Sequence, residues 1–135
     1  MFVDCAQAKD LVDNNTVVVV VDTNKPSYTE CQDLLYLTRT IVVLDHHRRG
    51  SEVIQNAVLS YVEPYASSTC EMVAEILQYF DEDLRLRSLE ADCLYAGMVI
   101  DTNNLLHAPA CVLRSSCLSS EKWRRYYKSP QNASG

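Results

Sequence analysis

Residues 16–22 read TVVVVVD and residues 40–50 read TIVVLDHHRRG, and these two stretches decide the fold. Each opens with an uninterrupted run of aliphatic, mostly β-branched side chains of strand length and then changes abruptly to polar residues. Runs of this kind are typical of strands that are buried on both faces, as they are in parallel sheets. Residues 58–62 predict a third strand, which Pro64 closes.

Stretches with helical spacing of apolar side chains lie before, between and after the predicted strands. They cover residues 1–13, 28–37, 69–80 and 89–100. Ser68 is followed three positions later by Glu71, the pattern of a helix N-cap, which favours a capping role for residues 67–69 over a nucleophile. Because strands that alternate with helices are joined by crossovers, we expect an α/β fold with a parallel sheet flanked by helices.

The composition is that of a packed globular chain. Of the 135 residues, 47% are hydrophobic and only three are glycine, which is enough to build a core. No apolar run is long enough to cross a bilayer, and no segment has the pattern of a secretion signal. A framework of disulfides is typical of small, loop-rich, secreted chains, which this chain does not resemble, so we expect reduced thiols in a cytoplasmic protein. The cysteines are Cys5, Cys31, Cys70, Cys93, Cys111 and Cys117.

Charge is distributed unevenly along the chain, whose formal net charge is -6. Residues 1–104 hold seven basic and 17 acidic residues, whereas residues 105–135 hold five basic and one acidic. An acidic body argues against binding duplex nucleic acid and suits a protein that holds divalent cations. Apolar periodicity also fades after Leu118, so we expect residues 105–135 to be a divergent tail, disordered or frameshifted, in which His107 and the basic aromatic run 122–128 have no function.

Acidic residues follow the first two predicted strands directly. Asp22 ends one run and Asp45 ends the other, which places both carboxylates at the edge of a parallel sheet where ligands bind. Asp22 on its own fits a turn residue that bonds its own backbone better than it fits a ligand. The run 45–47, Asp-His-His, is harder to explain as packing, because one imidazole can bind a metal while the other faces a substrate. Its alternative interpretation is a solvated polar turn.

A third carboxylate, Asp101, lies at the end of the predicted helix 89–100. The negative end of a helix dipole disfavours a carboxylate, so this position favours a compensating cation, although an ordinary C-terminal turn residue fits equally well. Carboxylates combined with one imidazole suit Mn²⁺ or Mg²⁺ better than zinc or copper. Such a set can hold two ions about 3.5–4 Å apart, which activate water and stabilise charge on phosphoryl oxygens.

Four motifs occur in an order and spacing that point to a known family. They are VVVVVD at 17–22, DHHRRG at 45–50, EPYASST at 63–69 and GMVIDT at 97–102. With these motifs the chain resembles the DHH phosphoesterases, and within them the catalytic domain of bacterial cyclic-di-AMP phosphodiesterases, over roughly residues 1–104. The resemblance implies a DHH domain that is joined to a smaller C-terminal substrate-binding domain.

The resemblance also implies roles for five residues and a cofactor. Asp22 corresponds to the carboxylate that bridges both metals, and His46 and Asp101 to ligands of one of them. His47 corresponds to the histidine that contacts phosphate, and Asp45 to the partner that orients an imidazole. The implied cofactor is a pair of Mn²⁺ ions, with Mg²⁺ as the alternative.

The chain departs from the family pattern at both ends. The family's first motif, a His followed by a D-x-D pair on an earlier strand, has no counterpart, and neither does the glycine-rich motif of the C-terminal domain. We therefore expect residues 1–104 to be a partial DHH domain within a fragment of a longer protein. The resemblance implies a parent that is membrane-anchored and dimeric.

The first hypothesis for function is a metal-dependent hydrolase that converts cyclic-di-AMP to linear pApA. An oligoribonuclease or nucleotide phosphatase that acts on short nucleotides is the alternative on the same core. A manganese-dependent pyrophosphatase fits less well, because the motifs at 48–50 and 63–69 are closer to those of the nucleotide enzymes. In two further alternatives the chain is not an enzyme. It is either a non-catalytic fragment that binds nucleotide or metal, or a purely structural domain.

Overall fold

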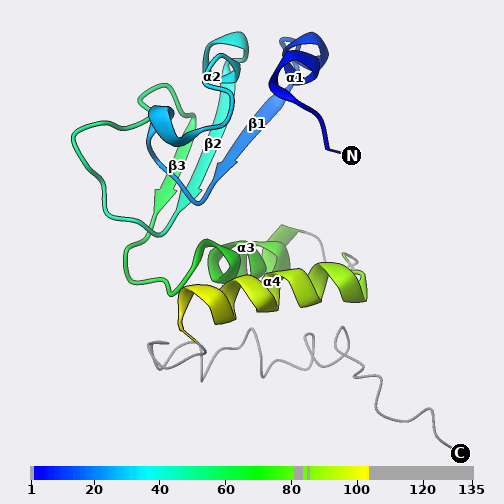
Figure 1. The fold of residues 1–135 in the computed structure, drawn as a ribbon, viewed down its shortest axis with the longest axis vertical. Helices are drawn as coiled ribbons and strands as arrows, with labels where there is room; N and C mark the ends of the chain where they lie inside the picture. The colour runs from blue at the N-terminus through cyan, green and yellow to red at the C-terminus, as the bar shows by residue number, and fades with distance from the viewer. Residues whose placement is uncertain (1, 81–83, 85, 104–135) are drawn as a thin grey trace, which may run out of the picture. The chain divides into compact units, whose positions relative to one another are not determined.

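The computed structural model describes residues 2–80, 84 and 86–103. In chain order their elements are α1 (Cys5–Leu11), β1 (Val17–Val21), the 3-10 helix η1 (Pro26–Tyr28), α2 (Leu34–Leu37), β2 (Thr40–Asp45), β3 (Leu59–Val62), α3 (Thr69–Phe80) and α4 (Ser88–Asp101) (Figure 1). The chain divides into two compact units, one up to Tyr65 and one from Ala66, and each is described by itself. The predicted tail 105–135 lies outside the described residues.

The first unit contains a parallel sheet whose strands lie in the order β1-β2-β3 (Figure 1). The register aligns Val18 with Ile41 and Val20 with Val43, and it aligns Asp45 with Val62 on the other side. Parallel neighbours in a sheet need long connections between them, and here helices and loops supply these connections. The α/β class and the parallel sheet predicted from the sequence are therefore confirmed.

The core of the first unit lies on one face of this sheet. It is formed by buried Val20, Leu35, Ile41, Val43 and Ile54, with Val18 and Ala57 packed against them. Ile41 and Val43 of the central strand have no exposed surface. The core is therefore centred on the strand that leads directly to Asp45.

β1 differs from the prediction that it is buried on both faces. Val17, Val19 and Val21 point away from the core and are 53%, 53% and 50% exposed. β1 is an edge strand of the described sheet, and the side chains of successive strand residues point to opposite faces. A continuous valine run indicated the strand correctly, but it carried no information about which face the fold would leave open.

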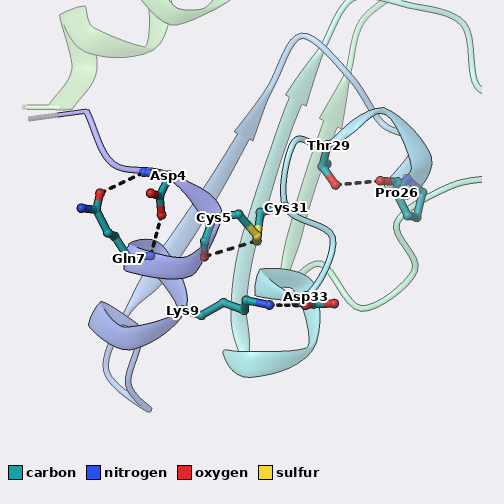
Figure 2. Close-up of a disulfide and its surroundings, with 8 residues drawn as sticks. All are labelled: Asp4, Cys5, Gln7, Lys9, Pro26, Thr29, Cys31 and Asp33. Carbon is teal, nitrogen blue, oxygen red and sulfur yellow. Dashed lines mark hydrogen bonds and ion pairs between the residues drawn. A yellow bond between two sulfur atoms is a disulfide. The ribbon is translucent and has the colours of Figure 1, made fainter.

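A disulfide joins α1 to the segment after η1 and contradicts the expectation of reduced thiols. Cys5 and Cys31 are bonded across 26 positions, with their Cα atoms 5.4 Å apart, a distance that suits a disulfide (Figure 2). An ion pair of 2.6 Å between Lys9 Nζ and Asp33 Oδ2 joins the same two segments. The spacing in the sequence could not reveal this pair, because tertiary packing alone brings the two segments together.

The helix predicted over residues 28–37 is largely wrong. The structure has only the short α2, preceded by η1 and by turns around Cys31. Two local bonds hold these turns: the Thr29 hydroxyl donates to the Pro26 carbonyl at 2.7 Å, and the Leu34 amide donates to the Cys31 carbonyl at 3.3 Å. Such local bonds compete with helix formation, which the spacing of leucines could not show.

The second unit contains the two helices that the sequence predicts, α3 and α4, and they pack side by side (Figure 1). The Ser68 hydroxyl accepts the Glu71 amide at 3.0 Å, which confirms Ser68 as the N-cap of α3. Buried Ala74, Ala91 and Met98 form the core between the two helices. Among the described residues no helix is long and apolar enough to cross a membrane.

Candidate metal centre

The candidate site lies where the strands of the first unit end. Asp22 follows β1 directly, and its amide donates to the Leu44 carbonyl of β2 at 3.0 Å. Its backbone has φ 65°, a left-handed conformation that aspartate tolerates better than most residues. This turn ends the strand and leaves the carboxylate at the carboxyl edge of the sheet, beside the end of β2.

Three of the predicted site residues come together at this edge. Asp22, His46 and His47 each offer one ligand atom, and these atoms lie within 4.8 Å of one another. His46 Nε2 is 3.5 Å from Asp22 Oδ1, and the two imidazole rings have centroids 4.4 Å apart. The His46 side chain is only 19% exposed, whereas Asp22 is 58% exposed and can be reached by a ligand.

Asp45 lies behind this cluster and has no exposed surface. Its Oδ1 accepts the His47 amide at 3.1 Å and lies 2.8 Å from His47 Nδ1, while its Oδ2 accepts the Asn24 side-chain amide. A carboxylate can only accept, so this contact places the proton of the neutral ring on Nδ1 and the lone pair on Nε2. Asp45 thus fixes the tautomer of His47, and its buried charge is compensated by three donors.

Asn24 was missed as a site residue by the sequence analysis, which interpreted its segment as a turn. It is 4% exposed and donates to Asp45 and, at 3.4 Å, to the His47 carbonyl. Its Oδ1 is buried without a partner among the described residues. The repeated triplet Asp-Thr-Asn, at 22–24 and 101–103, was the only signal in the sequence that could have drawn attention to it.

Asp101 ends α4 and so belongs to the second unit, whereas the cluster belongs to the first. It is exposed, and its neighbour Thr102 is buried, with the threonine hydroxyl donating to the Met98 carbonyl at 2.5 Å. The helix end predicted at this position is confirmed. Its role as a metal ligand stays a prediction.

The chemistry of the clustered donors fits a divalent cation. One carboxylate oxygen and two imidazole nitrogens form a mixed hard and borderline set, which suits Mn²⁺ better than calcium, whose ligands are all oxygens. The buried Asn24 Oδ1 beside the cluster adds an acceptor whose partner would be water or a cation. The residues present therefore fit a divalent cation, which Asp22 and His46 would hold.

The sequence profile described as "DHH family, N-terminal domain" matches residues 3–98. The chain belongs to the DHH family. Two curated relatives show where this DHH chain lies within the family. It is 49% identical over 98 residues to "Cyclic-di-AMP phosphodiesterase GdpP" of Geobacillus thermodenitrificans, and 41% identical over 97 residues to "Cyclic-di-AMP phosphodiesterase PdeA" of Listeria monocytogenes. These matches cover 73% and 72% of the chain.

The DHH chain is much shorter than these relatives. It spans 15% of the length of each of the two proteins. Among solved structures, it is similar to an exopolyphosphatase-related protein from Bacteroides fragilis, with a TM-score of 0.67, 21% sequence identity, and coverage of 92% of this chain and 39% of that one. The structural match supports the fold.

Proposed function

We propose that this DHH chain carries part of the active site of a Mn²⁺-dependent phosphodiesterase that hydrolyses cyclic-di-AMP to linear pApA. The observation that carries the proposal is the cluster of Asp22, His46 and His47 at the carboxyl edge of the sheet. The names of the curated relatives support the choice of substrate. In this proposal the domain works in the cytoplasm, and a membrane anchor and dimerisation of the parent stay predictions.

Each residue of the cluster has a distinct part in the proposed reaction. Asp22 and His46 hold the cation, joined by Asp101 if the second unit brings it near. When bound, the cation supplies Lewis-acid stabilisation of charge on the phosphoryl oxygens and activation of water. His47, whose side chain is 59% exposed, offers Nε2 to the phosphate or to a proton in transfer. Asp45 holds the His47 ring in the tautomer that this role requires.

Hydrolysis of cyclic-di-AMP by this chain tests the proposal. We expect Mn²⁺-dependent formation of pApA, measured by anion-exchange chromatography. Asp22→Ala and His46→Ala should each lower the rate at least about a hundredfold, because each removes a group that holds the cation. Asp10→Ala, which removes an exposed carboxylate of α1, is the matched control and should leave the rate unchanged.

The result that contradicts the proposal is equally clear. If circular dichroism shows a folded chain and Mn²⁺ binds, but no pApA forms, the chain is a non-catalytic fragment that binds metal or nucleotide. If Asp10→Ala lowers the rate as much as Asp22→Ala does, the loss follows from the change in net charge rather than from the site.

A further inference from the structure

A second feature of the same sheet edge is a surface hollow of about 470 Å³, lined by Arg48, Arg49, Val62, Pro64 and Tyr65. All five residues belong to the first unit. The volume falls within the range of about 300–1,000 Å³ that is usual for small-molecule sites. The lining combines two guanidinium groups with one aromatic ring and little other polarity.

Two residues that line the hollow are backbone neighbours of residues in the candidate metal centre. Arg48 follows His47 directly in the chain, and Val62 is the register partner of Asp45. The Glu63 amide donates to the Asp45 carbonyl at 2.9 Å, so the segment that leads to Tyr65 leaves the sheet beside the cluster. A ligand that is larger than one phosphate could therefore contact both places.

The charge of the hollow is opposite to that of its surroundings. Residues 1–65 contain nine acidic and five basic residues, and two of those five are Arg48 and Arg49. Among the described residues neither guanidinium forms an ion pair. Arg49 Nη2 donates to Ser60 Oγ at 3.3 Å, which leaves most of its five donors available for an anion with several oxygens, such as phosphate.

Among the described residues, Glu63 forms no ion pair with either arginine. One carboxylate oxygen of Glu63 accepts the Tyr65 amide at 3.1 Å, which turns the backbone after β3. The Tyr65 side chain is left 87% exposed next to Pro64. Solvent-exposed aromatic rings beside arginines are the usual platform for unpaired nucleobases, because every base presents a flat face for stacking.

We propose that this hollow is a nucleotide subsite, in which Arg48 and Arg49 bind a phosphate and Tyr65 stacks on the adjoining base. The inference rests on the proposed function, since a cyclic dinucleotide has a second nucleotide unit besides the phosphate under attack. It deepens that function by naming where the chain binds the second unit. A free nucleoside monophosphate is the smallest ligand that contains both recognised groups.

Binding of AMP to the full chain, in EDTA so that no divalent cation contributes, tests this subsite. Amide shifts in ¹H–¹⁵N spectra should change around residues 48–49, 60 and 65. The double variant Arg48→Gln/Arg49→Gln should weaken AMP binding at least about tenfold, because charge-assisted bonds are lost. Tyr65→Ala should weaken it about fivefold or more, whereas Tyr65→Phe, which keeps the ring, should bind within about twofold of the parent chain.

Matched controls come from the other end of the sheet. Arg39→Gln removes an exposed guanidinium just before β2, and Tyr36→Ala removes an exposed ring of α2, so both should bind AMP as the parent chain does. Raising the salt concentration should weaken binding of AMP in the parent chain and much less in the double arginine variant, because salt screens the arginine–phosphate attraction.

Three results would overturn the subsite. Inorganic phosphate that binds as tightly as AMP would show an anion site without recognition of the base. Adenosine that binds as tightly as AMP would show that the arginines are not used. Shifts confined to residues outside 48–65, or equal losses in Arg39→Gln, would place binding elsewhere. Because the cation is absent, failure of hydrolysis or of Mn²⁺ binding leaves this measurement intact, and the two proposals can fail separately.

Discussion

Asp45 is the residue on which the geometry of the candidate site depends. It has no exposed surface, ends the most deeply buried strand, and accepts bonds from the His47 backbone, the His47 ring and Asn24. A buried carboxylate is tolerated only with such compensation. The side chain that is least accessible to substrate therefore sets the orientation of the histidine that is most accessible to it.

Asp45→Asn should leave the fold intact but change the state of His47. An asparagine keeps the shape but removes the negative charge that holds the proton on Nδ1. We expect a mixed tautomer in the ¹⁵N spectrum of the His47 ring, and hydrolysis of cyclic-di-AMP slower by about 10- to 100-fold, because His47 is the group proposed to contact the phosphate. Asp33→Asn, in an exposed carboxylate that pairs with Lys9, is the control. An unchanged tautomer together with an unchanged rate of hydrolysis would rule out the orienting role of Asp45.

The sequence predicted the residues of the cluster but not all of its supports. Asp22 and the pair His46–His47 could be found because polar residues end two apolar runs, and the ends of parallel strands meet at one edge. Asn24 could not be distinguished from an ordinary turn residue in the sequence. Its burial depends on the pairing of β2 with β1, which brings β2 beside it. Whether Asp101 joins the cluster depends on the placement of a second unit, which local patterns do not encode.

At the scale of elements, the sequence predicted the strands and the helices α3 and α4 better than it predicted the segment between β1 and β2. α3 and α4 are long, have clear apolar spacing, and begin and end close to where the sequence indicated. The segment between β1 and β2, residues 22–39, contains Pro26 and is fixed by local turns and by the Cys5–Cys31 disulfide. Local turns together with one long-range bond decided its structure, so helical spacing alone gave the wrong answer.

Packing between α3 and α4 depends on the absence of a side chain at Gly97. A Cβ at this position would overlap Sγ of Cys70 on α3 and would lie 3.2 Å from its Cβ. Helix propensity alone predicts that Gly97→Ala stabilises the protein by about 1 kcal/mol. We expect the opposite sign, a loss of about 1–3 kcal/mol in the free energy of unfolding measured with urea, because the helices must separate.

A second variant separates packing from other causes. Cys70→Ala removes the sulfur, so the double variant Gly97→Ala/Cys70→Ala should lose clearly less than the sum of the two single changes. If Gly97→Ala is neutral or stabilising, or if the two losses simply add, the close approach of α3 and α4 at this position is not what the structure indicates.

At the scale of the whole molecule, the chain is a small part of the proteins that it resembles. It spans about 15% of the GdpP and PdeA relatives, yet it contains the DHH motif, the preceding strand with its aspartate, and the helix that ends in Asp101. The neighbouring ends of β1 and β2 bring Asp22, His46 and His47 together. Binding of a cation is therefore the property most directly expected of the chain itself.

Titration of the ¹⁵N-labelled chain with Mn²⁺ below one equivalent tests this property, because the paramagnetic ion broadens the amide signals nearest to it. The amides of Asp22, His46 and His47 should broaden first and saturably, and both Asp22→Ala and His46→Ala should abolish the effect, while Asp10→Ala leaves it unchanged. Broadening that never saturates, or that is spread evenly over the exposed acidic residues and persists in both site variants, would contradict a metal centre at the edge of this sheet.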